Sequence, residues 1–313
     1  MEKTKKLPRA LLNRNKLLKR TKNEKAVFSV AFVVFFFYAA LILLPIFYLF
    51  IMGSFVSVDE YANFVIARVR PDINVFSIKF EPHFENFLYI LECKVETRMQ
   101  TAYFPDLLIN SVWFCLIASV LPVVVSAFTG YVIAKYKFKG RDLIYSIVIF
   151  CMTIPIIGTT GAMLKLTSAM GIDNSPLYVI FTSLAGFGFN FMVLHAFFKN
   201  VSWNYVEAVL IDGGGHFTAF FKVMLPQAHS AITTLIILAL IGTYNDYTTP
   251  LLYLRDYPTI ASGIYQLTDY SAVDFNPTGV FAVLLISITP IIILFAVFSD
   301  RIMKNFSIGG LKG

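Results

Sequence analysis

Six separate runs of about 20 mostly apolar residues dominate this chain and restrict it to folds that a lipid bilayer can hold. Hydrophobic residues make up 57% of the 313 positions and charged residues only 14%, whereas a soluble domain carries about 25% charged residues. Backbone polar groups find no water inside a bilayer, so they must be satisfied within the helices themselves. The sequence therefore predicts an all-α fold, a polytopic transmembrane bundle of about six helices.

We expect each run to form one spanning helix. The runs cover residues 26–51, 107–134, 143–164, 176–198, 232–252 and 278–299. The first run is too long for the apolar region of a signal peptide and has no small-residue cleavage pattern, so we expect it to remain as an anchor. The expected domains are a basic tail, residues 1–25, and a transmembrane domain, residues 26–313.

The charges predict the orientation. An even number of spans places both termini on one side, and that side carries nineteen Lys and Arg residues, of which ten lie in residues 1–25. The opposite side carries seven basic and twelve acidic residues. Because Lys and Arg in short loops mark the cytoplasm, we expect both termini to be cytoplasmic. This asymmetry and anionic lipid account for the net charge of +7 without nucleic acid.

Two connecting segments are unusually long. Residues 53–106 form the expected external loop, and residues 199–231 form the expected cytoplasmic loop. In the cytoplasmic loop, Ser202 is a suitable N-cap for an amphipathic helix over residues 203–211. Trp203, Val206, Leu210 and Ile211 can share one face of that helix.

Three glycines, Gly213 to Gly215, are expected to end this helix, because glycine tolerates the left-handed conformation of a helix C-cap. A second helix is expected over residues 216–223, and Leu225-Pro226 is expected to break it before the fifth span. The sequence thus predicts a helix, a tight turn and a helix at the cytoplasmic surface. Such a projecting elbow is either a docking surface or an ordinary interfacial element.

Several kinds of site are absent from the sequence. No Lys-Ser or Lys-Thr follows the glycine run at the P-loop spacing, so the chain has no Walker A device for ATP. The four histidines and three cysteines show no metal-ligand spacing, and no nucleophile is paired with a base. We expect no catalytic residue, no metal and no cofactor in this chain.

One polar patch interrupts the fifth apolar run. Tyr244, Asn245 and Asp246 lie together there, and Asp246 is the one acidic residue inside an expected span. Ionisable residues within a membrane are costly and are commonly functional. The patch either lines a solute pathway, where polar and aromatic groups meet hydroxyls, or forms an interhelical hydrogen-bond anchor.

The cytoplasmic loop contains a motif with fixed spacing. Glu207-Ala208-Val209 is followed after three residues by Gly213 and after nine more by Val223-Met224-Leu225-Pro226. This motif resembles the EAA loop of binding-protein-dependent ABC importer permeases. The family pattern is Glu-Ala-Ala, three residues, Gly, nine residues, Ile, any residue and Leu-Pro. The spacing is intact, and the two departures, Val209 and Val223, are conservative.

Further residues resemble the carbohydrate-uptake branch of that family, the relatives of the smaller maltose permease. They are Asp212-Gly213, Phe138-Lys139-Gly140-Arg141, Asn110-Ser111, Tyr244-Asn245-Asp246, Glu85-Asn86-Phe87 and the ending Gly309-Gly310-Leu311-Lys312-Gly313. Ser202 departs from the branch, where a proline is usual. Residues 59–80 look like added length.

The resemblance implies a type I ABC importer permease fold in a bacterial inner membrane. It implies a second permease, favoured to be a different chain, two ATPase subunits that hold ATP and Mg²⁺, and an extracytoplasmic solute-binding protein. Residues 199–231 become the coupling loop, in which the residues expected to contact or position the ATPase are Glu207, Ala208, Asp212, Gly213, Leu225 and Pro226. A sugar or glycoside is the implied cargo. An ion-gradient-driven carrier and a non-transport membrane scaffold are the alternatives.

Overall fold

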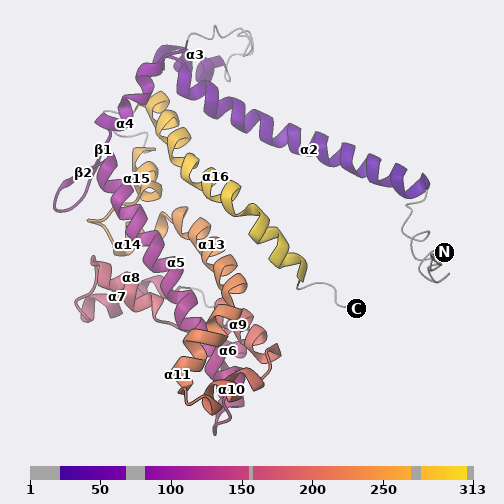
Figure 1. Cartoon of the computed structure of the whole chain (residues 1–313). Helices are drawn as coiled ribbons and strands as arrows, with labels where there is room; N and C mark the ends of the chain where they lie inside the picture. Colours follow the sequence, from indigo (N-terminus) through magenta and orange to yellow (C-terminus); the bar gives the residue numbers. More distant parts are fainter. Residues whose placement is uncertain (1–21, 68–81, 155–157, 269–275, 309–313) are drawn as a thin grey trace. The chain divides into compact units, whose positions relative to one another are not determined.

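The computed structural model describes residues 22–67, 82–154, 158–268 and 276–308 (Figure 1). The chain forms two compact units, residues 1–53 and residues 54–313. Apart from one two-stranded hairpin, the regular structure in the described ranges is helical, which confirms the all-α class. The predicted basic tail lies almost entirely outside the described residues.

Three helices, α2, α5 and α16, are much longer than the rest. In chain order, the elements are α2 Lys22–Phe55, α3 Val58–Ala67, the 3₁₀ turn η2 Phe84–Phe87, α4 Tyr89–Glu92, β1 Lys94–Glu96, β2 Thr101–Tyr103, α5 Phe104–Lys135, α6 Arg141–Thr153, α7 Thr159–Ala169, α8 Pro176–Ser183, α9 Phe189–Asn200, α10 Asn204–Ile211, α11 His216–Ala219, the π-helical turn η3 Phe220–Met224, α12 Leu225–Gln227, α13 His229–Tyr244, α14 Thr248–Tyr253, α15 Ile260–Leu267 and α16 Pro277–Ile308.

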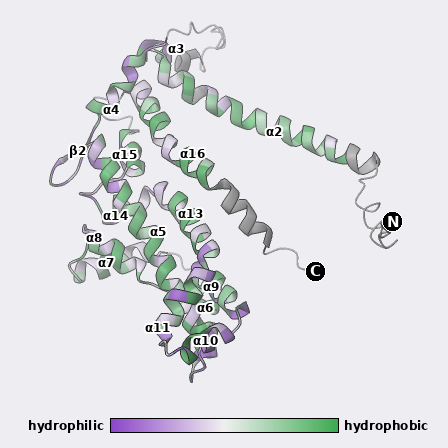
Figure 2. Ribbon diagram, viewed as in Figure 1, coloured by the Kyte–Doolittle hydropathy of each residue, from purple (hydrophilic) through white to green (hydrophobic). Residues whose placement is uncertain are grey.

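Three of the expected spans are continuous helices. In the described ranges, the segments long and apolar enough to cross a membrane are Val27–Phe55, Phe104–Lys135 and Pro277–Phe298. A bent pair, His216–Gln227 with His229–Tyr244, adds a fourth candidate if its two helices, which meet at 71°, form one span. Figure 2 shows hydrophobic residues distributed along α5 and along the first half of α16.

The other three expected spans are interrupted helices, which corrects the expectation of six unbroken spans. Residues 143–164 divide between α6 and α7, and Ile154, which ends α6, is extended as expected of a residue that precedes proline. Residues 176–198 divide between α8 and α9. At that break Gly188 has a φ of 148°, which glycine adopts far more readily than other residues.

The third interruption follows Tyr244, where α13 ends and residues 245–247 lead to α14. Asn245 Nδ2 donates to the carbonyl of Ile241 at 2.8 Å, and Asp246 Oδ1 accepts from the backbone N–H of Thr249 at 3.0 Å. Short polar side chains that bond to nearby backbone compete with the helical pattern. Asp246 therefore lies in a helix break rather than within a helical span.

The long helix α5 organises the second unit. At Gly130 an added Cβ would lie 3.0 Å from the backbone nitrogen of His195, so a glycine is needed where α5 crosses α9. The main buried cluster joins these two helices to α13 and to the chain between them. Its members are Val123, Ala127, Tyr131, Leu194, Phe198, Val206, Ala219, Phe220, Met224, Ala228 and Leu235.

The two long loops lie at opposite ends of α5. The antiparallel hairpin pairs Val95 with Ala102, and both side chains pack with Leu107 near the start of α5. At the other end, Lys135 Nζ donates to the carbonyl of Val201, just before α10. A 32-residue helix is about 48 Å long, which exceeds the hydrocarbon thickness of about 30 Å. Most of the expected added length, residues 59–80, lies outside the described residues.

Candidate functional site: the elbow between α9 and α13

Residues 203–227 form a helical elbow that we define as α10, the glycine turn, α11, η3 and α12 (Figure 1). Ser202 Oγ accepts from the backbone N–H of Asn204 at 3.3 Å and so helps to begin α10. Val206 is fully buried, and Trp203 and Leu210 are half-buried. Ile211 is 84% exposed, however, which corrects its assignment to the packed face. The packed stripe is narrow, and Ile211 is rotated about 100° from Leu210.

The glycine turn is a Schellman motif. The backbone N–H of Gly214 donates to the carbonyl of Val209 at 2.8 Å, and that of Gly213 donates to the carbonyl of Leu210 at 3.1 Å. Gly213 has a φ of 79°, the left-handed conformation that this motif requires at its C′ position. The predicted glycine stop is confirmed, and the next helix begins at His216.

The second half of the elbow runs without a break from His216 to Gln227, as α11, η3 and α12. Pro226 does not end this helix, which corrects the expected break at Leu225-Pro226. Pro226 directly follows the π-helical turn η3, where the backbone already departs from regular α-helical hydrogen bonding. The change of direction comes at Ala228, between the two helices that meet at 71°.

Tyr136, the C-cap of α5, contacts both halves of the elbow. Its ring meets Trp203 edge to face at 5.6 Å, and its hydroxyl lies 3.0 Å from Nδ1 of His216. The same hydroxyl lies 3.3 Å from that of Tyr131, a buried residue of α5. The elbow is therefore mounted on α5 by hydrogen bonds as well as by apolar packing. The sequence analysis did not single out Tyr136, because its contacts come from segments up to 80 residues away.

The exposed surface of the elbow combines acidic and apolar groups. Four predicted coupling residues lie there together and are all exposed, namely Glu207, Ala208, Asp212 and Gly213. Neither acidic group has an ion pair within the described part of the chain. Large apolar side chains are exposed on the same elbow, namely Tyr205, Ile211, Phe217 and Phe221. Aromatic and aliphatic groups surrounded by charges are typical of a protein docking surface.

The other two predicted coupling residues have a different setting. Leu225 is half-buried and packs against the main cluster beside Met224. Pro226 follows it at the start of α12, next to the bend into α13. The structure thus places Leu225-Pro226 at the joint between the elbow and α13, apart from the Glu207–Gly213 segment.

The second candidate cluster consists of Tyr244, Asn245 and Asp246, which are adjacent at the end of α13. Tyr244 is half-buried, and its hydroxyl donates to the carbonyl of Ser287 in α16 at 2.7 Å. Asn245 and Asp246 make the local backbone bonds that interrupt the helix. These contacts give each of the three residues a structural role at the break.

An exposed aromatic pair lies just beyond this break. Tyr247 and Tyr265 stack with ring centroids 4.8 Å apart and an interplanar angle of 10°. Their side chains are 44% and 54% exposed. Tyr265 comes from α15 and was missed by the sequence analysis, because only the tertiary structure brings it to Tyr247. An exposed tyrosine pair offers flat apolar faces and hydroxyl groups to a polar ligand.

Similar proteins share most of the length of this chain. The diacetylchitobiose uptake system permease protein NgcG of Streptomyces coelicolor is 24% identical over 93% of this chain and 91% of the relative. The arabinooligosaccharides transport system permease protein AraQ of Halalkalibacterium halodurans is 28% identical over 83% and 93%, respectively. The trehalose transport system permease protein SugB of Mycobacterium tuberculosis is 29% identical over 67% and 78%.

A solved structure shares the fold. It is the crystal structure of a bacterial ABC transporter involved in the import of the acidic polysaccharide alginate. One of its chains aligns with a TM-score of 0.70 and 19% identity over 90% of this chain and 98% of that chain. The overall fold described above is therefore shared with a chain of that transporter.

The family follows from the sequence match. Residues 123–307, more than half of the chain, match the model of the binding-protein-dependent transport system inner membrane component. This match includes the whole elbow, and it favours the importer hypothesis over the carrier and scaffold hypotheses. The chain therefore belongs to this family, the membrane-spanning permease subunits of ABC importers.

Proposed function

We propose that this permease conducts a sugar or glycoside inward and that its elbow couples the pathway to a separate ATPase. The names of the relatives, which include permeases for diacetylchitobiose, arabinooligosaccharides and trehalose, support a carbohydrate cargo. A permease subunit is not itself an enzyme, since ATP hydrolysis in these systems belongs to another subunit. Our proposal assigns ATP and Mg²⁺ to that partner.

One observation carries the coupling role. The elbow exposes a mixed acidic and apolar surface, yet Val206, Ala219, Phe220 and Met224 anchor it in the cluster that contains α5, α9 and α13. Close-packed interiors transmit displacement rather than absorb it. A movement of the ATPase against Glu207, Ala208 and Asp212 would therefore shift the helices as well. Gly213 supplies the turn, and Leu225-Pro226 forms the joint with α13.

We assign the solute pathway to the interrupted helices. In membrane carriers, non-helical backbone at membrane depth is tolerated where it is buried in protein or lines a cavity, and solute sites form at such breaks. Asn245 and Asp246 form the break after Tyr244 and directly precede Tyr247, which stacks on Tyr265. We propose that this stack contacts the cargo, while Tyr244, Asn245 and Asp246 hold the break in shape.

The assembly and orientation are also proposals. The family implies a partner permease, an ATPase and a solute-binding protein. We propose one second permease of different sequence, two ATPase subunits and an extracytoplasmic binding protein. The excess of basic residues near the chain ends and on the 199–231 side supports cytoplasmic termini and a cytoplasmic elbow.

The test is ATPase activity of the assembled complex in nanodiscs, with its ATPase and its binding protein. We expect activity to rise when the binding protein is loaded with an oligosaccharide, and Gly213→Arg to abolish that rise while the chain stays in the membrane. Solute flux through this chain in liposomes without any ATPase would contradict the proposal. If activity rose only when the binding protein carried a ligand other than a sugar, the proposed cargo would be wrong and the proposed coupling role would stand.

A further inference from the structure

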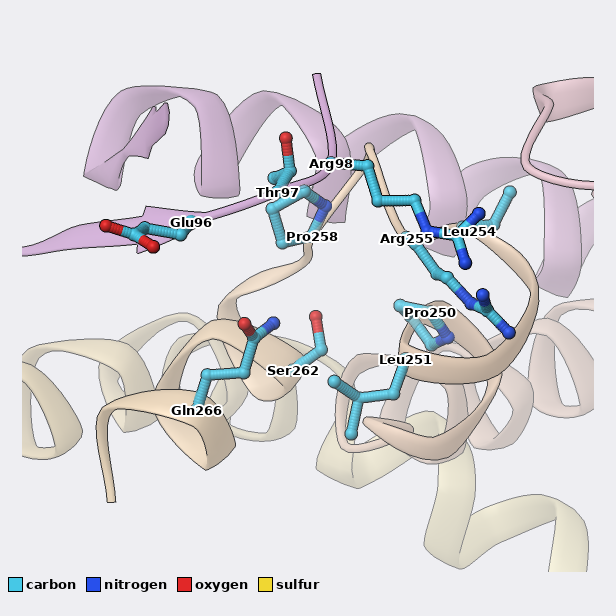
Figure 3. Close-up of a pocket in the computed structure, with 10 residues that line it drawn as sticks. All are labelled: Glu96, Thr97, Arg98, Pro250, Leu251, Leu254, Arg255, Pro258, Ser262 and Gln266. Carbon is cyan, nitrogen blue, oxygen red and sulfur yellow. The ribbon is translucent and has the colours of Figure 1, made fainter. Parts of the chain in front are cut away.

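A cavity of about 490 Å³ lies at the hairpin end of α5, far from the elbow. Figure 3 shows that the turn between β1 and β2 forms one wall, and that α14, α15 and the loop between them form the rest. Gln266 contributes a polar group to the lining, and Pro250 and Leu251 contribute apolar ones. Two arginines, Arg98 and Arg255, also line the cavity, and Figure 3 shows their side chains extending toward the same end of it.

A buried carboxylate holds the backbone at both arginines. Asp256, which is 8% exposed, accepts from the backbone N–H of Arg98 through Oδ1 at 3.0 Å. Its Oδ2 accepts from Nδ2 of Asn174, and its backbone N–H donates to Oδ1 of Asn174 at 2.9 Å. Arg255 is the preceding residue in the chain. The bonds of Asp256 therefore hold the backbone from which both arginine side chains extend.

Asp256 accepts from a backbone N–H and from an amide side chain, and no ion pair joins it to either guanidinium within the described ranges. Neither Arg98 nor Arg255 has an ion pair within the part of the chain that the structure describes. Both side chains are exposed. Glu96, the other acidic residue of the lining, lies at the opposite end of the cavity (Figure 3). An anion bound at this end of the cavity would be attracted by both positive charges and would offset their mutual repulsion.

We propose that this cavity binds an oxyanion, a phosphate or a carboxylate, carried by a small polar molecule. Paired guanidinium groups present parallel N–H donors that match two oxygens of such a group. The volume falls within the range of about 300–1,000 Å³ that is usual for small-molecule sites. Gln266 is placed to bond the polar body of the ligand, and Leu251 and Pro250 to contact its carbon skeleton. A lipid headgroup and a soluble anion share this chemistry.

The test compares two double variants of the assembled complex. Arg98→Gln with Arg255→Gln removes the two cavity charges. Lys94→Gln with Lys165→Gln removes the same charge from exposed residues that do not line the cavity. Soluble ligands are tested by calorimetry in dodecyl maltoside and phosphate-free buffer, with glycerol 3-phosphate and glucuronate as probes. Lipid is tested by native mass spectrometry after reconstitution in equal parts of phosphatidylcholine and phosphatidylglycerol.

We expect the arginine variant to bind at least one class of probe about tenfold more weakly, and the lysine variant to match the wild type. Loss of retained phosphatidylglycerol alone would identify a lipid headgroup, and loss of a soluble probe alone would identify a free anion. Equal binding by wild type and arginine variant in both arms would overturn the proposal. If only the affinity for the binding protein fell, the arginines would be protein contacts, and the anion site would also be refuted.

Discussion

The three consecutive glycines of the elbow are under different constraints. Gly213 has the positive φ of the Schellman turn. At Gly214 an added Cβ would lie 2.6 Å from Cγ1 of Val209 and 2.9 Å from its carbonyl oxygen, so steric room is the constraint. Gly215 is extended and has open space around it. Within this run of glycines, Gly213 is required by its backbone conformation, Gly214 is required by the limited space, and Gly215 is under neither constraint.

We predict that Gly213→Ala destabilises the turn by about 1 kcal/mol, because the left-handed conformation is unfavourable for a residue with a Cβ. Gly213→Asn should cost less, since asparagine tolerates this conformation, and Gly215→Ala should be neutral. The measurement is the stimulated ATPase rate of the assembled complex, with hydrogen exchange of residues 204–219 as the structural readout. Equal behaviour of the alanine and asparagine variants would refute the conformational explanation.

Tyr136 is the residue through which the end of α5 holds the elbow. We predict that Tyr136→Phe loosens the elbow by about 1 kcal/mol, because it removes the hydroxyl contacts and keeps the ring. Tyr136→Ala should loosen it further, since the contacts with Trp203 and the His216 ring are also lost. Faster hydrogen exchange in residues 204–224, graded from Phe to Ala, is the expected measurement. Unchanged exchange in the alanine variant would show that Tyr136 does not hold the elbow.

Other family-like residues act as joints rather than as contact sites. Asn86 Nδ2 donates to the carbonyls of Ser54 and Val56, and its Oδ1 accepts from Thr278 at the start of α16. Ser111 Oγ accepts from the backbone N–H of Ile260 at 2.8 Å. These bonds tie irregular backbone to long helices, where unsatisfied polar groups would be costly.

At the scale of elements, one side of the elbow is buried in the core and the other side is exposed. The side that carries Val206, Phe220 and Met224 belongs to the core, and the side that carries Ile211 and Phe217 does not. Because Ile211 is 84% exposed, its replacement changes no buried contact. A defect at this position would therefore report on a partner rather than on folding.

We predict that Ile211→Asp reduces co-purification of the ATPase at least about tenfold, since a buried interfacial anchor commonly contributes about 2 kcal/mol or more. The amount of chain in the membrane should stay at the wild-type level, and Ile211→Val serves as the matched control. Normal co-purification of the aspartate variant would place the ATPase contact elsewhere on the cytoplasmic surface.

At the scale of the whole molecule, the hairpin turn and the elbow mark the two ends of α5. Met99, at the tip of the hairpin, and Ile211, on the elbow, are each 84% exposed. Native cysteines interfere little with labelling at these sites. Burial raises the pKa of the Cys93 thiol, so less of the reactive thiolate is present, and Cys115 is also buried. Cys151 is exposed, so the labelling experiment uses a protein in which Cys151 is replaced by serine.

In this background we predict that Met99→Cys reacts with a membrane-impermeant maleimide on intact spheroplasts. Ile211→Cys should react only after the membrane is permeabilised. This result follows from the basic excess at the chain ends, which orients the elbow toward the cytoplasm. The reverse pattern would show that both termini are external.

The local chemistry of the sequence was sufficient to predict the helical class, the long apolar segments and the elbow with its glycine stop. These features depend on residues close together in the chain, namely apolar runs that need internal hydrogen bonds and a glycine that tolerates a positive φ. Only the tertiary structure decided that three expected spans are interrupted and that Pro226 continues a helix. It also decided that Ile211 faces outward, and it revealed the Tyr136 mount, the Tyr247–Tyr265 stack and the paired arginines. Each of these depends on which distant segment packs beside a residue, which local pattern does not encode.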